Sequence, residues 1–165
     1  MSETTTPLVQ DVHWDIEYRV RLGTAWSRFM RGLQQKELWA TTCSHCDRCF
    51  VPPQSYCEFC YEAVGGWTQL EPVGVLRAST IVYQGFAGGP TVPYAVGAIA
   101  IDGSTSLLMH FLGGVDLTDA DAARKSLHEG LRVRAIWADD RTAAITDIRH
   151  FEPDSAERQT PAGRR

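Results

Sequence analysis

The first forty residues contain two segments in which apolar residues recur with different periods. Over residues 13–22, aromatic and aliphatic side chains alternate with polar ones, and this period of two predicts an extended segment with one apolar face. Gly23 ends the alternation, and Thr24 can cap a helix that we expect to continue to about Leu38. The apolar residues with helical spacing in this helix are Trp26, Phe29, Met30 and Leu33. This apolar face either packs on the protein's own core or binds a partner protein.

The second half of the chain contains five runs of residues that predict β-strands. The runs cover residues 73–83, 94–102, 106–112, 131–138 and 143–151. The alternation is clearest in the fourth run, where Val133, Ala135 and Trp137 alternate with two arginines. A short helix over residues 119–129, ended by Gly130, is expected between the third and fourth runs. Five strands with a helix in this place have the element order of an OB-fold barrel.

These patterns divide the chain into five parts. The parts are an N-terminal extension (residues 1–22), a helix (23–39), a module that contains all five cysteines (40–70), a five-stranded domain (71–153) and a C-terminal tail (154–165). Residues 1–12 and the tail are polar, and we expect both to be disordered. The predicted fold class is therefore mainly β with one N-terminal helix.

Length and composition limit the protein to one or two small globular modules. The chain has 165 residues and a mass of 18.3 kDa, with 44% hydrophobic and 22% charged residues. This is too short for a full-size thiolase, dehydrogenase or kinase. The longest stretch of low charge, residues 78–101, is interrupted by glycines and prolines, so we predict no membrane span. Because the N-terminus resembles no secretory signal, we expect the protein in the cytoplasm.

The charge of the chain disfavours nucleic acid as a partner. The formal net charge is −4, and Lys36 and Lys125 are the only lysines. Proteins that bind nucleic acid obtain much of their affinity by neutralising phosphates, so they are usually basic. Local patches of charge can still differ in sign from the total.

Four of the five cysteines form two pairs, each with two residues between its members. Cys43 and Cys46 make the first pair, and after ten residues Cys57 and Cys60 make the second. Each pair can present two thiolates from a tight turn, and four thiolates about 2.3 Å from zinc complete a tetrahedron. Such a site leaves no position for water or substrate, so we predict one structural zinc ion per chain. Iron is the alternative, because tetrathiolate sites also bind it.

The fifth cysteine and a nearby histidine add an alternative to this ligand set. Cys46 and Cys49 also have two residues between them, and His45 could bind a metal. We favour Cys43 and Cys46 as ligands, with Cys49 as a small buried residue beside the site and a redox-active Cys49 as the alternative. Because this module is too small to build a core, we expect metal binding to supply much of its folding free energy.

The sequence does not favour catalysis by the chain itself. A nucleophile requires a base within hydrogen-bond reach, and the G-x-S-x-G motif of serine hydrolases is absent. His110 lies between Met109 and Phe111 in a predicted strand, a position more typical of a core or surface histidine than of a catalytic base. We therefore predict no catalytic residue in this chain.

The order of the motifs along the chain is distinctive as a whole. An apolar helix precedes the two cysteine pairs, and glycine-containing strands follow them. The runs are WSRFMRGLQQKELWA, CSHC, PP, CEFC, VGVLRAST, PYAVGAIAIDG, MHFLGG, GLRVRAIW and HFEP. Over about residues 24–153 this order resembles the DUF35 family, whose members are zinc-ribbon and OB-fold proteins. The chain departs from the family pattern at Asp47, where glycine is common, and in the additional Cys49.

The resemblance implies a rubredoxin-like zinc ribbon followed by a five-stranded OB-fold barrel. It also implies a non-catalytic accessory subunit of a thiolase-like enzyme that acts on acyl-CoA, with the catalytic residues in that partner. Such a subunit would be needed for assembly or activity of the partner and would help to shape its CoA-binding channel. The aromatic residues that we expect at the partner interface are Trp14, Tyr18, Trp26 and Phe29.

A loop and three arginines are candidates for contact with acyl-CoA. The glycine-rich loop over residues 85–90 borders the usual ligand face of an OB barrel. Gly88 would admit a narrow pantetheine arm, and Phe86 would rest on it. A CoA phosphate would also need arginine, and the arginines in predicted strands are Arg77, Arg132 and Arg134. The alternatives are a flexible surface hairpin and arginines that face solvent.

Two other functions are compatible with a zinc ribbon and an OB barrel. A single-stranded nucleic-acid binder would combine a basic groove with stacking aromatic residues, whereas this chain has scattered aromatic residues and two lysines. A rubredoxin-like redox carrier would hold iron and would be red when purified.

Overall fold

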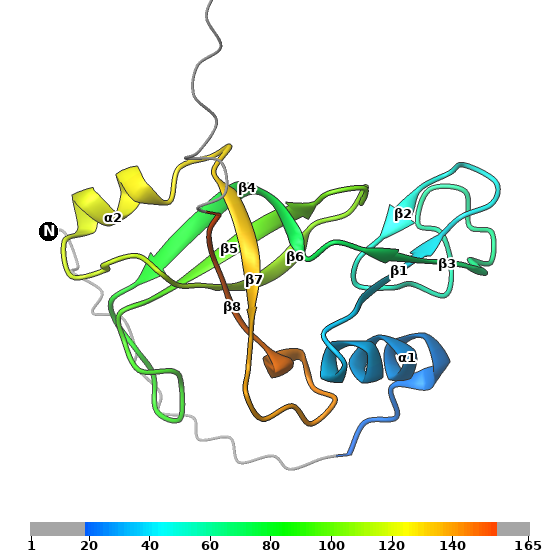
Figure 1. Ribbon diagram of the computed structural model, residues 1–165, viewed down its shortest axis with the longest axis horizontal. Coiled ribbons are helices and arrows are strands. Elements are labelled where there is room, and N and C mark those ends of the chain that lie inside the picture. Colours follow the sequence, from blue (N-terminus) through cyan, green and yellow to red (C-terminus); the bar gives the residue numbers. More distant parts are fainter. Residues whose placement is uncertain (1–18, 155–165) are drawn as a thin grey trace, which may run out of the picture.

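The computed structural model describes residues 19–154, in which a helix and a three-stranded sheet lie beside a five-stranded barrel (Figure 1). Of the predicted extended segment only residues 19–22 are described, and they belong to no strand. Trp14, Tyr18 and nearly all of the predicted tail lie outside the described residues.

The barrel contains five strands that close in the order β4-β5-β6-β8-β7. The strands are β4 (Val73–Val82), β5 (Tyr94–Ile101), β6 (Leu108–Leu112), β7 (Arg132–Trp137) and β8 (Ile148–Pro153). All neighbours pair antiparallel except β6 and β8, which pair in parallel where Leu112 lies opposite Phe151. Helix α2 (Ala120–Ser126) connects β6 to β7. The predicted OB-fold element order is confirmed.

Strand β5 shows how the sequence pattern places side chains in the barrel. Its residues alternate between half-buried and buried along the whole strand, so every second residue points into the core. At Gly97 an added Cβ would lie only 2.6 Å from Leu76 Cδ1 and 2.9 Å from Leu112 Cδ1. Glycine at this position therefore lets two large side chains from neighbouring strands meet inside the barrel.

The three-stranded sheet carries the cysteines and receives the N-terminal helix. Its strands are β1 (Leu38–Thr42), β2 (Cys49–Phe50) and β3 (Gly66–Leu70), in the order β2-β1-β3. Helix α1 (Gly23–Gln34) packs on β1 and buries the residues Ala25, Phe29, Met30, Gly32 and Leu33. The sequence pattern predicted the helix but none of these three short strands.

One hydrophobic core continues from the helix through the sheet into the barrel. Phe29 and Leu33 of α1 are fully buried together with Leu38 of β1 and with Leu76 and Ile99 of the barrel. The apolar face of α1 therefore packs on the protein's own core, the first of the two alternatives left by the sequence pattern.

Hydrogen bonds join β2 to the loop between β5 and β6. The Cys49 amide donates to Thr105 Oγ1 (3.0 Å), and the Thr105 amide donates to the Cys49 carbonyl (2.8 Å). The Val51 amide donates to Ser106 Oγ (2.7 Å), whose hydroxyl donates to the Val51 carbonyl (2.9 Å). Because Cys49 and Val51 are buried, these bonds satisfy backbone groups that water does not reach, and they fix the sheet against the barrel.

Helix α1 ends four residues before the expected Leu38. The Lys36 amide donates to the Leu33 carbonyl (3.0 Å) and the Glu37 amide to the Gly32 carbonyl (2.8 Å). Lys36 adopts a left-handed conformation with φ of 65°. These two bonds form a Schellman ending that reverses the chain into β1.

The last predicted strand, residues 143–151, begins later than its apolar composition suggested. Ala143 has a positive φ of 60°, and a 3₁₀ turn, η1 (Ile145–Asp147), precedes β8. The buried carboxylate of Asp147 accepts hydrogen bonds from the amides of Thr142 (2.9 Å) and Ala144 (3.2 Å). A polar side chain that binds nearby amides competes with strand pairing, which explains the turn.

Within the described residues, neither helix combines the length and the apolar character that crossing a bilayer requires.

The hydrogen bonds of Ser106 predict a measurable loss of stability in Ser106→Ala. This substitution leaves the buried amide and carbonyl of Val51 unpaired, so we expect unfolding free energy to fall by about 1–3 kcal/mol. Ser126→Ala, which removes an exposed hydroxyl on α2, should change it by less than about 0.5 kcal/mol. Urea unfolding measures both values, and equal losses would contradict this account of the junction.

Candidate metal centre

The first cysteine pair lies in a tight turn between β1 and β2. The Cys43 amide donates to the Arg48 carbonyl (2.9 Å), and the Asp47 amide donates to the Cys43 carbonyl (2.9 Å). Asp47 has a positive φ of 55°, a conformation that glycine adopts most easily and that aspartate tolerates. The departure from glycine at this position therefore leaves the turn intact.

The second pair repeats the same geometry. The Cys57 amide donates to the Glu62 carbonyl (2.9 Å), and the Tyr61 amide donates to the Cys57 carbonyl (2.9 Å). Tyr61, like Asp47, follows its cysteine pair directly and has a positive φ, here of 62°. The chain thus forms two equivalent turns, each of which presents two thiols toward the other.

The four thiols converge on one point. The Sγ atoms of Cys43 and Cys60 are 3.5 Å apart, as are those of Cys46 and Cys57, and Cys46 and Cys60 are separated by 3.9 Å. All four sulfur atoms lie within 4.8 Å of one another. A tetrahedron with metal–sulfur bonds of about 2.3 Å has edges of about 3.8 Å. The four cysteines are therefore positioned to bind a metal ion.

The thiols of this cluster influence one another's pKa in opposite directions. Burial opposes ionisation of Cys57, but the amides of Cys60 and Phe59 and the neighbouring thiols outweigh it and lower its pKa to about 6. At Cys60 the Glu62 amide favours the thiolate, but burial and the three other cysteines raise the pKa to about 12. One thiolate thus forms readily and opposes the next, an obstacle that a bound cation removes.

Cys49 and His45 are not part of this cluster. Cys49 packs in the main core with 6% of its surface exposed, and burial raises the pKa of its thiol. The favoured prediction of a small buried cysteine is confirmed, and a buried thiol with a raised pKa is a poor redox group. His45 is exposed and does not join the four-cysteine group.

His110 is a core residue with both ring nitrogens engaged. The Phe111 amide donates to His110 Nδ1 (2.9 Å), so the proton resides on Nε2, which donates to the Ile145 carbonyl (3.2 Å). Only 7% of its surface is exposed, and burial lowers the pKa of the imidazole. This ring holds β6 against the turn before β8 and has no nitrogen left for catalysis.

The three candidate arginines lie on two strands of the barrel. Arg132 of β7 binds the Asp102 carboxylate through both terminal nitrogens, at 2.8 and 2.7 Å, and these hydrogen bonds lower the pKa of Asp102. Arg134 follows two residues later and is exposed. Arg77 is exposed on β4, where the pairing with β5 is irregular.

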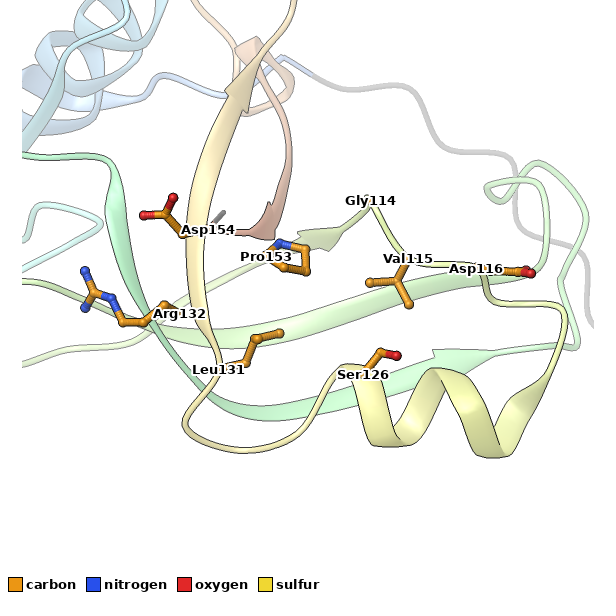
Figure 2. Close-up of a pocket in the computed structure, with 8 residues that line it drawn as sticks. All are labelled: Gly114, Val115, Asp116, Ser126, Leu131, Arg132, Pro153 and Asp154. Atoms are coloured by element: carbon orange, nitrogen blue, oxygen red, sulfur yellow. The ribbon is translucent and has the colours of Figure 1, made fainter. Parts of the chain in front are cut away.

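Arg132 also lines a pocket of about 550 Å³ between α2 and the ends of β6, β7 and β8 (Figure 2). The other charged residues at this pocket are Asp116 and Asp154, so acidic groups outnumber basic ones. A phosphate entering here would compete with Asp102 for Arg132 and would meet two further carboxylates. These charges do not favour an anionic ligand.

The glycine-rich loop follows the C-terminal end of β4, whereas Arg132 and Arg134 of β7 lie beside the start of β4. Arg132 pairs opposite Val75, whereas Phe86 and Gly88 follow the end of the strand at Val82. Seven residues of extended strand cover about 23 Å, so Arg132 and Arg134 do not lie in one site with Phe86 and Gly88. Phe86 is 71% exposed.

The predicted interface residues on α1 have different environments. Phe29 is fully buried in the core, so its side chain is not available to a partner, and the expectation for this residue is corrected. Trp26 packs edge-to-face on Phe29 and is 38% exposed. Helical spacing gave both residues the same face, but Phe29 lies inside the core and Trp26 packs against its outer edge.

The sequence did not single out an uncharged surface on the outside of the barrel. Opposite residues on β4, β5 and β6 form two rows, Ala78–Ala98–Met109 and Thr80–Val96–Phe111, with Tyr94 beside Val82. We call these eight residues the β4–β6 face. Met109 is 60% exposed and Phe111 37%, and an apolar pocket of about 200 Å³ adjoins them. The regular alternation in β5 was the available signal, but strand pairing was needed to assemble the surface.

Two family models match the chain. The rubredoxin-like zinc ribbon domain of ChsH2 matches residues 30–64, and the C-terminal OB-fold domain of ChsH2 matches residues 67–138. Of solved structures, a DUF35-family protein of unknown function from Sulfolobus solfataricus is 20% identical, with a TM-score of 0.58 over 80% of this chain and 87% of that chain. The Ltp2-ChsH2(DUF35) aldolase is 17% identical, with a TM-score of 0.57 over 77% of this chain and 92% of that chain. No curated protein matches.

The converging thiols predict that metal content depends on Cys57 and not on Cys49. Elemental analysis of the purified wild type should give about one metal ion per chain. We expect Cys57→Ser to lose the ion, whereas Cys49→Ala should keep it because Cys49 lies in the main core. Retention of the ion by Cys57→Ser, or its loss from Cys49→Ala, would refute this ligand set.

Burial of His110 predicts a dependence of stability on pH. Its pKa is lowered in the folded protein, while the unfolded chain protonates near pH 6.5. The unfolded state therefore binds more protons below about pH 6.5, and the free energy of unfolding falls as the pH decreases through that region. His110→Gln should lose less stability between pH 7 and 5.5 than the wild type in urea unfolding. The control His128→Gln, at an exposed residue, should show the same change of unfolding free energy with pH as the wild type. The same change in His110→Gln as in the wild type would show that His110 does not cause the pH dependence.

Proposed function

The chain belongs to the DUF35 family and carries the zinc ribbon and OB-fold domains of ChsH2, and from this premise we propose that it is an accessory subunit of a thiolase-type acyl-CoA complex. The partner subunit supplies the catalytic residues. This chain holds the partner in its active arrangement. The solved Ltp2-ChsH2(DUF35) aldolase, in which a protein of this fold occurs with another subunit, supports the proposal.

The β4–β6 face is the main structural support for the proposed function. Its eight residues include no charged side chain, and large apolar groups such as Met109 stand open to solvent. Contiguous apolar surface of this kind marks sites of protein association. A phosphate-bearing ligand would need cations that this face does not offer. A protein surface is the occupant that matches its chemistry.

The metal centre supports the same function in a different way. Four thiolates complete the tetrahedral coordination shell of an ion, which leaves no open position for substrate. Within the proposed function we assign zinc to the site as a structural ion. The residues present fit such an ion because each turn holds its two thiols by backbone hydrogen bonds. When bound, the ion would stabilise the small sheet and leave the chemistry to the partner.

Contact with acyl-CoA remains a separate prediction within this function. Arg77 and Arg134 are exposed, and Phe86 and Gly88 lie in the loop between β4 and β5. Arg132 is the weakest candidate because Asp102 already occupies both of its terminal nitrogens. A channel shaped by this chain would use the loop or the exposed arginines.

Isolation of the tagged full-length chain from its native cells tests the proposed function. We expect a thiolase-like subunit to co-purify in stoichiometric amount, together with about one zinc ion per chain. Met109→Asp places a charge on the β4–β6 face and should abolish co-purification while the metal content is unchanged. Ala122→Asp adds the same charge at an exposed residue of α2 and should have no effect. A zinc-loaded chain that is recovered alone, or with nucleic acid, would refute the proposal.

A further inference from the structure

Basic residues are concentrated at one end of an otherwise acidic chain. Residues 19–36 contain five of the 16 basic residues and none of the 20 acidic ones. The rest of the chain keeps 11 basic and 20 acidic residues, which gives it a net charge of −9. The segment that contains α1, with a charge of +5, therefore has the opposite sign to the net charge of the remainder.

Helix α1 presents these charges on the side away from the core. Arg21, Thr24, Ser27, Arg28 and Arg31 line one shallow hollow of about 600 Å³, and the three arginines are exposed. We call these five residues the α1 basic face. The members within the helix are three or four residues apart, from Thr24 to Arg31, so they lie on the side opposite the buried Phe29 and Leu33. Arg21 precedes the helix by two residues and lines the same hollow.

The zinc ribbon holds the centre of the α1 basic face in place. The Arg28 guanidinium stacks on the ring of Trp39 at 4.5 Å and on the ring of Trp67 at 4.3 Å. These tryptophans belong to β1 and β3, so two strands of the sheet position one helical arginine. A guanidinium fixed in this way loses less conformational entropy when a partner binds.

The charges of α1 are not neutralised within residues 19–154. Three arginines elsewhere form ion pairs in this region: Arg124 with Asp121, Arg132 with Asp102 and Arg149 with Asp139. No such pair with an acidic residue involves Arg21, Arg28 or Arg31 among the described residues. The positive potential of the face is therefore available to a molecule outside the described fold.

We propose that the α1 basic face docks on an acidic patch of the partner subunit, an inference that rests on the proposed function. Charge complementarity selects this occupant. The face is compact, since a helix of 12 residues is about 18 Å long. A nucleic acid would extend past it and meet the net charge of −9 on the remainder of the chain. A localised group of carboxylates on a protein matches both the size and the sign of the face.

Charge reversal on α1 tests the docking surface with the full-length chain and the co-purified partner subunit. Arg21→Glu/Arg31→Glu spares Arg28, whose packing on two tryptophans is structural. At 50 mM NaCl we expect this variant to associate with the partner about tenfold more slowly than the wild type, or slower still. Raising the salt to 300 mM should slow the wild type and largely remove the difference. Biolayer interferometry measures these rates, and unchanged metal content verifies folding.

A matched control and a milder variant keep the result interpretable. Arg124→Glu/Lys125→Glu changes the net charge equally on exposed positions of α2 and should associate like the wild type. Arg21→Gln/Arg31→Gln removes the charges without reversing them and should have an intermediate rate.

Each outcome separates this inference from the proposed function. Equal rates for the α1 variant and the α2 control would overturn the inference while the complex itself still formed. Failure of the wild type to associate with any thiolase-like subunit would overturn both. Salt-dependent dimerisation of the isolated chain that is lost in Arg21→Glu/Arg31→Glu would assign the face to a second copy and overturn the inference. Tight binding of a single-stranded oligonucleotide that is lost in the same variant would assign the face to nucleic acid and would also overturn the inference.

Discussion

The four converging cysteines hold together a part of the chain that has almost no core of its own. Apart from Cys43 and Cys57, Phe50 is the only fully buried member of the cluster around them, and Val64 is partly buried. Two turns of this size cannot offset the entropy lost on folding by burying so little apolar surface. Bonds from the thiolates to a metal ion would provide the missing stabilisation for the two cysteine turns, whereas Leu38 and Ala40 of β1 are held by the main core.

The small sheet connects the cysteine turns to the helix and to the barrel. Strand β2 leads from the first cysteine turn into Val51, whose backbone is bonded to Ser106 of the barrel. Strands β1 and β3 carry the tryptophans that hold Arg28, and α1 closes the core from the other side. The α1 basic face and the β4–β6 face are thereby attached to one continuous core.

Features that depend on local spacing could be predicted from the sequence. The two cysteine pairs indicated the metal centre directly, and the alternation in five runs indicated the barrel. Features that depend on tertiary contacts could not. Helical spacing put Trp26 and Phe29 on the same face, but only packing distinguishes the exposed residue from the buried one. The turn at Asp147 arises from a buried carboxylate that binds neighbouring amides, and apolar composition alone suggested a strand there.

Oxidation of Met109 by hydroxyl radicals, compared between the isolated chain and the complex with the proposed partner, shows whether that partner covers the β4–β6 face. Met109 is 60% exposed on the β6 side of the β4–β6 face, and Met30 is 8% exposed in the core and serves as the internal reference. We expect Met109 to be oxidised rapidly in the isolated chain and slowly in the complex, while Met30 is oxidised slowly in both. Equal oxidation of Met109 in the two samples would show that the partner does not cover this face and would contradict the account.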